Sequence, residues 1–291
     1  MDIRALLMGL TFAVIWSSAF TSARVIVAYA PPLTALCLRF LISGLIAVIV
    51  ARMLGQSWRL TRAQWVATAI YGVCQNTLYL GLNFMAMQTI EASLAAIISS
   101  TMPLLVAFAG WVVFRENVRP LGIAGLIVGV VGVVVIMASR LQGNVDIYGV
   151  LLCIGGVMSL TFATMAVRTA SSGGNVLMIV GLQMLIGSLT LSLPAAVFET
   201  IEVELTWQLV VAFTYTTIFP GLVGSAVWFM LVRRIGAVKA STYHFLTPFL
   251  GVAIAALMLG ERLGVLDMAG VAIIAAGIFA VQISKQNPTR M

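Results

Sequence analysis

Long apolar segments separated by short polar connections run through the whole chain. They predict membrane-spanning helices over about residues 4–22, 31–51, 65–86, 92–114, 120–139, 147–167, 175–195, 207–231, 237–259 and 264–284. Each run is close to the roughly 20 residues that cross a bilayer as a helix. The first is expected to stay in the mature protein, because it is too long for a signal peptide. We therefore expect an all-α polytopic membrane protein with ten transmembrane helices.

The sequence matches itself, without a gap, when it is shifted by 145 residues. Phe84-Met85 then meets Phe229-Met230. Further matched pairs are Ala92 and Ala237, Pro103 and Pro248, Glu116 and Glu261, Gly125 and Gly270, and Gly132 and Gly277. The match predicts two five-helix repeats, 1–145 and 146–291. Because five spans reverse the side of the membrane, the second repeat enters inverted, as in inverted-repeat transporters with a cavity between the halves.

Basic residues are distributed unevenly between the connections. If the N-terminus is cytoplasmic, twelve of the 16 Lys and Arg residues face the cytoplasm, and only Arg24, Arg140 and Arg262 face outward. Seven of the nine acidic residues then lie outside. Since positive charge gathers in cytoplasmic loops, both termini are predicted in the cytoplasm, with the protein in a bacterial inner membrane.

The composition supports the same class. The chain is 62% hydrophobic and 9% charged, with a mean hydropathy of +1.11, which leaves too little polar surface for a soluble globule. The net charge of +7 does not indicate nucleic acid, because no basic face is clustered. Cys37, Cys74 and Cys153 are expected to be small buried residues. The expected partners are a small-molecule substrate and the lipid bilayer, with no cofactor, metal or nucleic acid, and a monomer or homodimer as the assembly.

Several short motifs resemble a known family. They are Arg39-Phe40 in the second span, the Ala-rich segment that leads to Pro103 and ends in Arg115-Glu116, and its copy that leads to Pro248 and ends in Gly260-Glu261-Arg262. With ten spans in two repeats, they make the chain resemble the EamA-type branch of the drug/metabolite transporter superfamily. Within that branch it is similar to aromatic amino-acid exporters of the YddG type, although no quoted motif is particular to them.

The resemblance implies a basket-like bundle with a central cavity, cytoplasmic termini, and export of amino acids or related metabolites. One position departs from symmetry: Gln183 stands in the second repeat where the first has Arg39. Which half holds the substrate stays open.

A polar stripe in the third span is the main candidate for a cavity wall. Gln75, Tyr79 and Asn83 recur every four residues, with Asn76 close to the same face. Polar groups inside a membrane line a cavity or meet a partner. The stripe therefore predicts hydrogen bonding and ring stacking with a substrate, with the tying together of neighbouring helices as the alternative.

His244 lies one turn before Pro248 in the ninth span, beside Tyr243, and its repeat partner is Ser99. It is the side chain whose ordinary pKa lies near physiological pH, so it is the candidate for any proton coupling. A neutral histidine bonded to a neighbouring helix is the alternative. As a wall residue it is better supported than as a proton carrier.

Pro103 and Pro248 are expected to kink the middle of their helices, either as gates during access switching or as static bends. The substrate cavity should then lie near Ser99, Ser100, Tyr243 and His244.

Arg39 is the one formal charge expected inside a span. It could attract a substrate carboxylate, or it could bond helix-end carbonyls or a nearby loop. Trp16, Ser17 and Thr161 complete the expected lining.

No Asp or Glu lies in the middle of an expected span, and no nucleotide-binding motif is visible. A facilitative carrier or exchanger that works by alternating access is therefore expected, and large neutral or aromatic amino acids fit its wall best. Export of drugs or quaternary cations is the alternative within transport. From another class, a membrane-embedded lipid-modifying enzyme would need convergent ionisable residues that the sequence lacks, so we expect no enzyme.

Overall fold

The structure is a computed structural model that describes residues 2–112, 119–142, 145–170, 175–236, 240–261 and 264–286. Within these ranges the chain forms helices and no β-strand. Arg115, Glu116 and Arg262 lie outside the described residues. The first half contains α1 (Ile3–Val27), α2 (Pro32–Met53), α3 (Arg62–Tyr71), η1 (Gly72–Leu80), α4 (Gly81–Ala86), α5 (Ala92–Ser99), α6 (Met102–Val112) and α7 (Pro120–Gln142).

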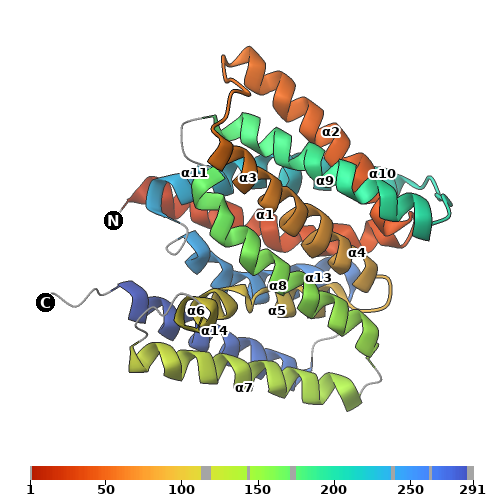
Figure 1. The fold of residues 1–291 in the computed structure, drawn as a ribbon. Helices are drawn as coiled ribbons and strands as arrows, with labels where there is room; N and C mark the ends of the chain where they lie inside the picture. The colour runs from red at the N-terminus through yellow and green to blue at the C-terminus, as the bar shows by residue number, and fades with distance from the viewer. Residues whose placement is uncertain are drawn as a thin grey trace, which may run out of the picture.

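The second half follows the same order. It contains α8 (Ile147–Ala170), α9 (Val176–Phe198), α10 (Trp207–Thr216), η2 (Thr217–Gly224), α11 (Ser225–Ile235), η3 (Thr242–Leu246), α13 (Thr247–Leu259) and α14 (Val265–Gln286). The helices form one bundle, in which the start of α1 and the end of α14 lie at the same side (Figure 1).

Two of the expected spans are interrupted near proline. The range 92–114 divides into α5 and α6, and the range 237–259 contains the 3₁₀ turn η3 followed by α13. Pro103 and Pro248 are each the second residue of the helix after the interruption. Proline is tolerated there because the first-turn N–H groups need no intrahelical partner. The bend therefore lies before each proline rather than at it.

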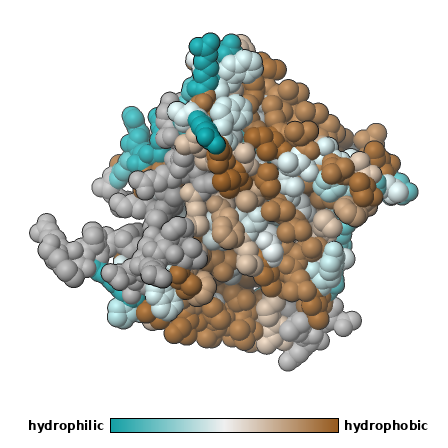
Figure 2. Space-filling model, viewed as in Figure 1, coloured by the Kyte–Doolittle hydropathy of each residue, from teal (hydrophilic) through white to brown (hydrophobic). Residues whose placement is uncertain are grey.

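The surface is that of a membrane protein. Seven helices of the described chain are long and apolar enough to cross a bilayer, and two shorter apolar helices, Tyr243–Leu259 and Val265–Val281, accompany them. In Figure 2 hydrophobic side chains cover the middle of the visible face, and hydrophilic ones gather toward the ends of the helices. Leu189 and Leu193 on α9 are 73% and 70% exposed, an exposure suited to lipid contact.

Pairs of helices from the two halves pack closely and antiparallel. A Cβ on Gly125 of α7 would lie 2.7 Å from the carbonyl oxygen of Gly277 on α14, and one on Gly132 would lie 2.9 Å from that of Gly270. The glycine faces are thus used within one chain, because backbone can approach this closely only where side chains are absent.

Helices α2 and α9 also pack closely and antiparallel. Gly44 meets Gly181, and the Ser188 hydroxyl donates to the carbonyl of Cys37 at 2.9 Å. A shift of 144 residues relates Arg39 to Gln183. The same shift takes Cys37 to Gly181 and Gly44 to Ser188, so each of these two contacts is the repeat counterpart of the other.

Two carboxylates from the second half hold helix starts in the first half. Glu199 accepts hydrogen bonds from Leu33 N, Thr34 N and Thr34 Oγ1, each at 2.7 Å. Glu261 accepts from Ala92 N and Ser93 N at 2.9 and 3.0 Å. The first N–H groups of a helix have no intrahelical partner, and anions stabilise them. Glu261 therefore caps the start of α5.

Candidate functional site

The third and eighth expected spans each contain a π-helical segment. The segment η1 covers Gly72–Leu80 and η2 covers Thr217–Gly224, so they begin 145 residues apart. π-turns add a residue to the helical repeat and occur often at functional sites. Their matched places make the middle of these two spans the first candidate for a site.

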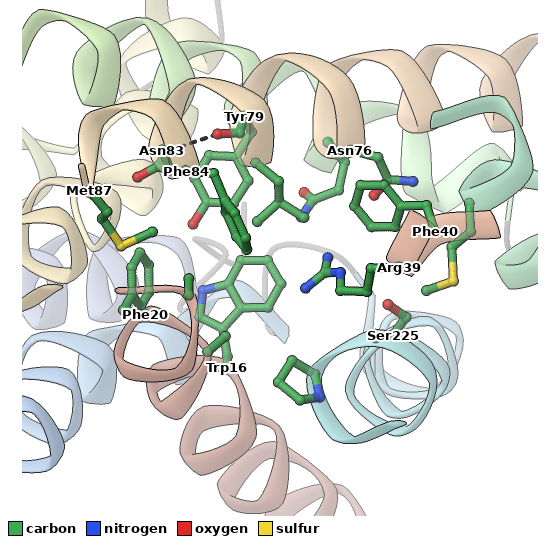
Figure 3. A pocket seen from close by; sticks show the side chains of 17 residues that line it. Trp16, Phe20, Arg39, Phe40, Asn76, Tyr79, Asn83, Phe84, Met87 and Ser225 are labelled. Atoms are coloured by element: carbon green, nitrogen blue, oxygen red, sulfur yellow. Dashed lines mark hydrogen bonds between the residues drawn. The ribbon is translucent and has the colours of Figure 1, made fainter. Parts of the chain in front are cut away.

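A narrow cavity of about 40 Å³ lies between these two segments. The helices α1, α2, α4, α9 and α11 complete its wall, and Figure 3 shows the side chains around it. The lining residues are Trp16, Ala19, Phe20, Ala23, Arg39, Phe40, Gln75, Asn76, Tyr79, Leu80, Asn83, Phe84, Met87, Met184, Pro220, Gly221 and Ser225. The wall combines aromatic faces with a few polar groups, a combination typical of small-molecule sites.

The polar stripe of the third span supplies much of the polar wall. Asn76 Nδ2 donates to the carbonyl of Gln183 at 2.9 Å and also bonds the Gln183 side-chain oxygen. Asn83 Nδ2 donates to the carbonyl of Tyr79 at 2.8 Å. These two amides line the cavity and also fix local structure.

Gln75 differs from these amides. Its side chain is 4% exposed and lines the cavity, and its Oε1 has no hydrogen-bond partner in the described part of the chain. A buried acceptor without a donor is costly, so it is available to a ligand.

Aromatic rings form part of the cavity wall. Trp16 stacks parallel to Tyr79, with ring centroids 6.0 Å apart and an interplanar angle of 2°. Behind it, His244 makes edge contacts with Phe12, Trp16 and Trp228 at 5.2, 5.4 and 5.3 Å. We call Phe12, Trp16, Trp228 and His244 the base cluster. His244 is 2% exposed and lies behind Trp16 rather than in the lining itself.

Beyond the base cluster, the start of α1 is tied to the end of α11. Arg234 donates to both oxygens of Asp2, at 2.5 and 3.1 Å. This hydrogen bond lowers the pKa of the Asp2 carboxyl below its usual range, so the pair is ionised at neutral pH. A separate wide hollow is lined by Val27, Met85 and the connection that carries Glu199.

The structure brings five of the expected site residues into the cavity wall and places the others around it. Those in the wall are Trp16, Arg39, Gln75, Tyr79 and Asn83. The residues outside it are Ser17, Ser99, Ser100, Pro103, Thr161, Tyr243, His244 and Pro248. Ser100 and Thr161 donate to carbonyls of their own helices, Ile97 at 2.6 Å and Val157 at 2.8 Å. Ser99 donates to Asn83 Oδ1 at 3.4 Å, so it contacts the wall from behind.

Sequence reasoning missed the contribution of the eighth span. Pro220, Gly221 and Ser225 line the cavity, and the shift of 145 residues places them opposite Gln75, Asn76 and Leu80. Carrying the polar stripe across the repeat would have found Pro220 and Gly221, but not Ser225, because Leu80 is not part of the stripe. Phe20, Met87 and Met184 gave no such signal, because they are ordinary apolar residues within apolar helices.

An apolar bundle with an amphiphilic cavity at its centre is the architecture of a membrane transporter. The model of the EamA-like transporter family matches residues 3–138 and 147–283, and the chain belongs to this family. Transport and membrane embedding follow from that membership, together with membership of the drug/metabolite transporter superfamily.

Two proteins that are similar to the chain over most of its length are described as transport proteins. The uncharacterized transporter YvbV of Bacillus subtilis is 29% identical over 94% of this chain and 90% of its own. A probable amino-acid metabolite efflux pump of Salmonella typhimurium is 23% identical over 94% and 92%. A protein of known crystal structure superimposes with a TM-score of 0.72 and 19% identity, over 98% of this chain and 99% of its own. That likeness supports the fold alone.

Proposed function

We propose that the protein is an inner-membrane carrier that exports amino acids, aromatic or other large neutral ones, or related small metabolites, as exporters of the YddG type do. The observation that carries the proposal is the central cavity, in which the faces of Trp16, Tyr79 and Phe84 stand beside neutral amides. Such a wall matches a substrate with an apolar ring and a polar head group. The similarity to a probable amino-acid metabolite efflux pump supports the same substrate class.

The proposed mechanism is alternating access by two inverted five-helix repeats, 1–145 and 146–291, with ten spans and both termini in the cytoplasm. The exchanged contacts of α2 with α9 and of α7 with α14 support this organisation, because helices related by the shift lie antiparallel. The matched π-segments support it too. Transport is facilitative in this proposal, since no Asp or Glu is among the described residues that line the cavity.

Counterflow in proteoliposomes tests the proposal. Vesicles loaded with unlabelled phenylalanine should take up labelled phenylalanine without an imposed proton gradient. Tyr79→Ala should lower this uptake roughly tenfold, because it removes a ring that stacks on the substrate. Tyr148→Ala is the matched control, because Tyr148 is 62% exposed at the start of α8.

If folded wild-type protein moves no amino acid, the substrate class is wrong. Counterflow of a quaternary cation would then favour the drug-efflux alternative. Turnover of a lipid by the same vesicles would favour the lipid-modifying enzyme.

His244 separates packing from proton coupling. His244→Phe should retain counterflow, because an aromatic ring keeps the contacts to Phe12, Trp16 and Trp228. His244→Ala should lose most of it, because a cavity opens beneath Trp16. The measurement is uptake by both variants between pH 6 and 8. Wild-type uptake that requires a pH gradient and is abolished in His244→Phe would instead assign a proton to His244.

A further inference from the structure

Arg39 is a charged side chain with an unusual position. It lies on α2 in the interior of the bundle, is 3% exposed, and lines the central cavity. In Figure 3 its guanidinium points from α2 toward the middle of the pocket, on the side where Trp16 lies. It is therefore presented to whatever occupies the cavity.

The neighbours of this guanidinium are aromatic rather than acidic. Its central carbon lies 4.5 Å from the ring centroid of Phe40 and 5.7 Å from that of Phe84. These rings stabilise a cation through their faces, and they leave the N–H groups at its edge unused. Within the described part of the chain, no carboxylate lines the cavity.

The hydrogen bonds of Arg39 are unfilled. Its Nε is buried without a partner in the described ranges, and no helix-end carbonyl or loop oxygen in those ranges is bonded to it. A buried charge without a partner is strongly unfavourable, and charge-assisted bonds to a bidentate carboxylate relieve that cost best. The structural role considered for Arg39 has no contact here to support it.

Gln75 gives an independent second observation on the same cavity. Its Oε1 is a buried acceptor without a donor, whereas Arg39 offers only donors. The cavity thus holds one unpartnered cation and one unpartnered neutral acceptor. Together they match a head group with an anionic oxygen pair and an N–H group.

We propose that Arg39 and Gln75 form the head-group subsite of the carrier, with Arg39 binding the substrate carboxylate and Gln75 Oε1 accepting from its amino group. This inference rests on the proposed function and specifies its substrate. Because the Gln75 acceptor is neutral, the substrate's amino group adds little to the binding free energy. The carboxylate is therefore the feature that binding requires. Carboxylic acids that lack the amino group should bind, whereas the corresponding amines should not.

Equilibrium binding in nanodiscs tests the subsite with three probes of one skeleton: phenylalanine, 3-phenylpropanoate and phenethylamine. Wild-type protein should bind both carboxylates at least roughly tenfold more tightly than the amine. Arg39→Gln should weaken both carboxylates roughly 10- to 100-fold and leave the amine unchanged. Arg39→Lys should recover part of the loss, because the charge remains without the fork.

Arg52→Gln is the matched control, because Arg52 lies at the exposed end of the same helix. Thermal unfolding of ligand-free Arg39→Met separates binding from structure. A binding role predicts an unchanged or higher melting temperature, because an unpaired charge is removed. A structural role predicts a lower one.

Three binding results would overturn the inference: wild-type protein that binds neither carboxylate, a folded Arg39→Gln variant that binds them as tightly as wild type, or an amine that binds equally well. Counterflow of the amine alone would reject the subsite and leave the carrier function intact. Carboxylate binding without any counterflow would support the subsite and reject the carrier.

Discussion

Replacing Gly277 with alanine is expected to destabilise the protein more than adding a methyl group at any other position of α14. The new Cβ would lie 2.5 Å from Gly129 N and 2.7 Å from the carbonyl oxygen of Gly125. Both are backbone atoms of α7, so no side chain can rotate away, and the two helices must separate. Overpacking of this kind costs about 3 kcal/mol, against a gain of about 1 kcal/mol in helix propensity.

The melting temperature in detergent should therefore fall by roughly 5 °C or more. Gly155→Ala on α8 is the matched control. The nearest atom to its new Cβ is Leu82 Cδ1 at 3.5 Å, which is ordinary contact, so its melting temperature should hold or rise. Equal melting temperatures for the two variants would show that α7 and α14 do not pack this closely.

Glu199→Gln should be the second strongly destabilising change. The carboxylate accepts three hydrogen bonds at the start of α2, where the residue before the helix, Pro31, provides no side-chain cap. An amide keeps one oxygen and turns its NH₂ toward donors. The loss of charge-assisted bonds at a helix N-terminus costs about 2 kcal/mol, which lowers the melting temperature by roughly 5 °C.

Glu202→Gln in the same connection makes the same chemical change without that consequence. Glu202 is exposed, and the structure gives its carboxylate no hydrogen bond within the described residues. Its variant should melt within about 1 °C of wild type, since surface substitutions of this kind have small effects. A drop as large as that of Glu199→Gln would assign the effect to the net charge of the connection instead.

The sequence predicted the helices well, because their apolar runs are long and local. It did not predict the interruptions within them. An extra residue per turn leaves no compositional mark, so the residues of the π-segments η1 and η2 did not reveal their helix type. Pro103 and Pro248 did indicate where helices bend, although the bend precedes each proline.

The site was predictable where polarity stood out against the apolar background. Gln75, Tyr79 and Asn83 share one face by spacing alone, and Arg39 is conspicuous as a charge. The other side of the wall was not predictable in this way. Met184 and Phe20 are lining residues only because of how distant helices meet, and His244, polar as it is, lies one ring behind the wall. Depth within a bundle depends on tertiary packing that a single helix pattern does not contain.

The antiparallel pairing of α7 with α14, and of α2 with α9, suits an ancestor with only half of this chain. Under the proposed repeat organisation, two identical five-helix subunits inserted in opposite orientations could form a homodimer through these same two helix contacts. Such a homodimer must place identical residues on both sides of its cavity. Fusion into one polypeptide removes that restriction, and it allows Gln75 and Asn76 to face Pro220 and Gly221 across a pocket that recognises one end of an asymmetric molecule.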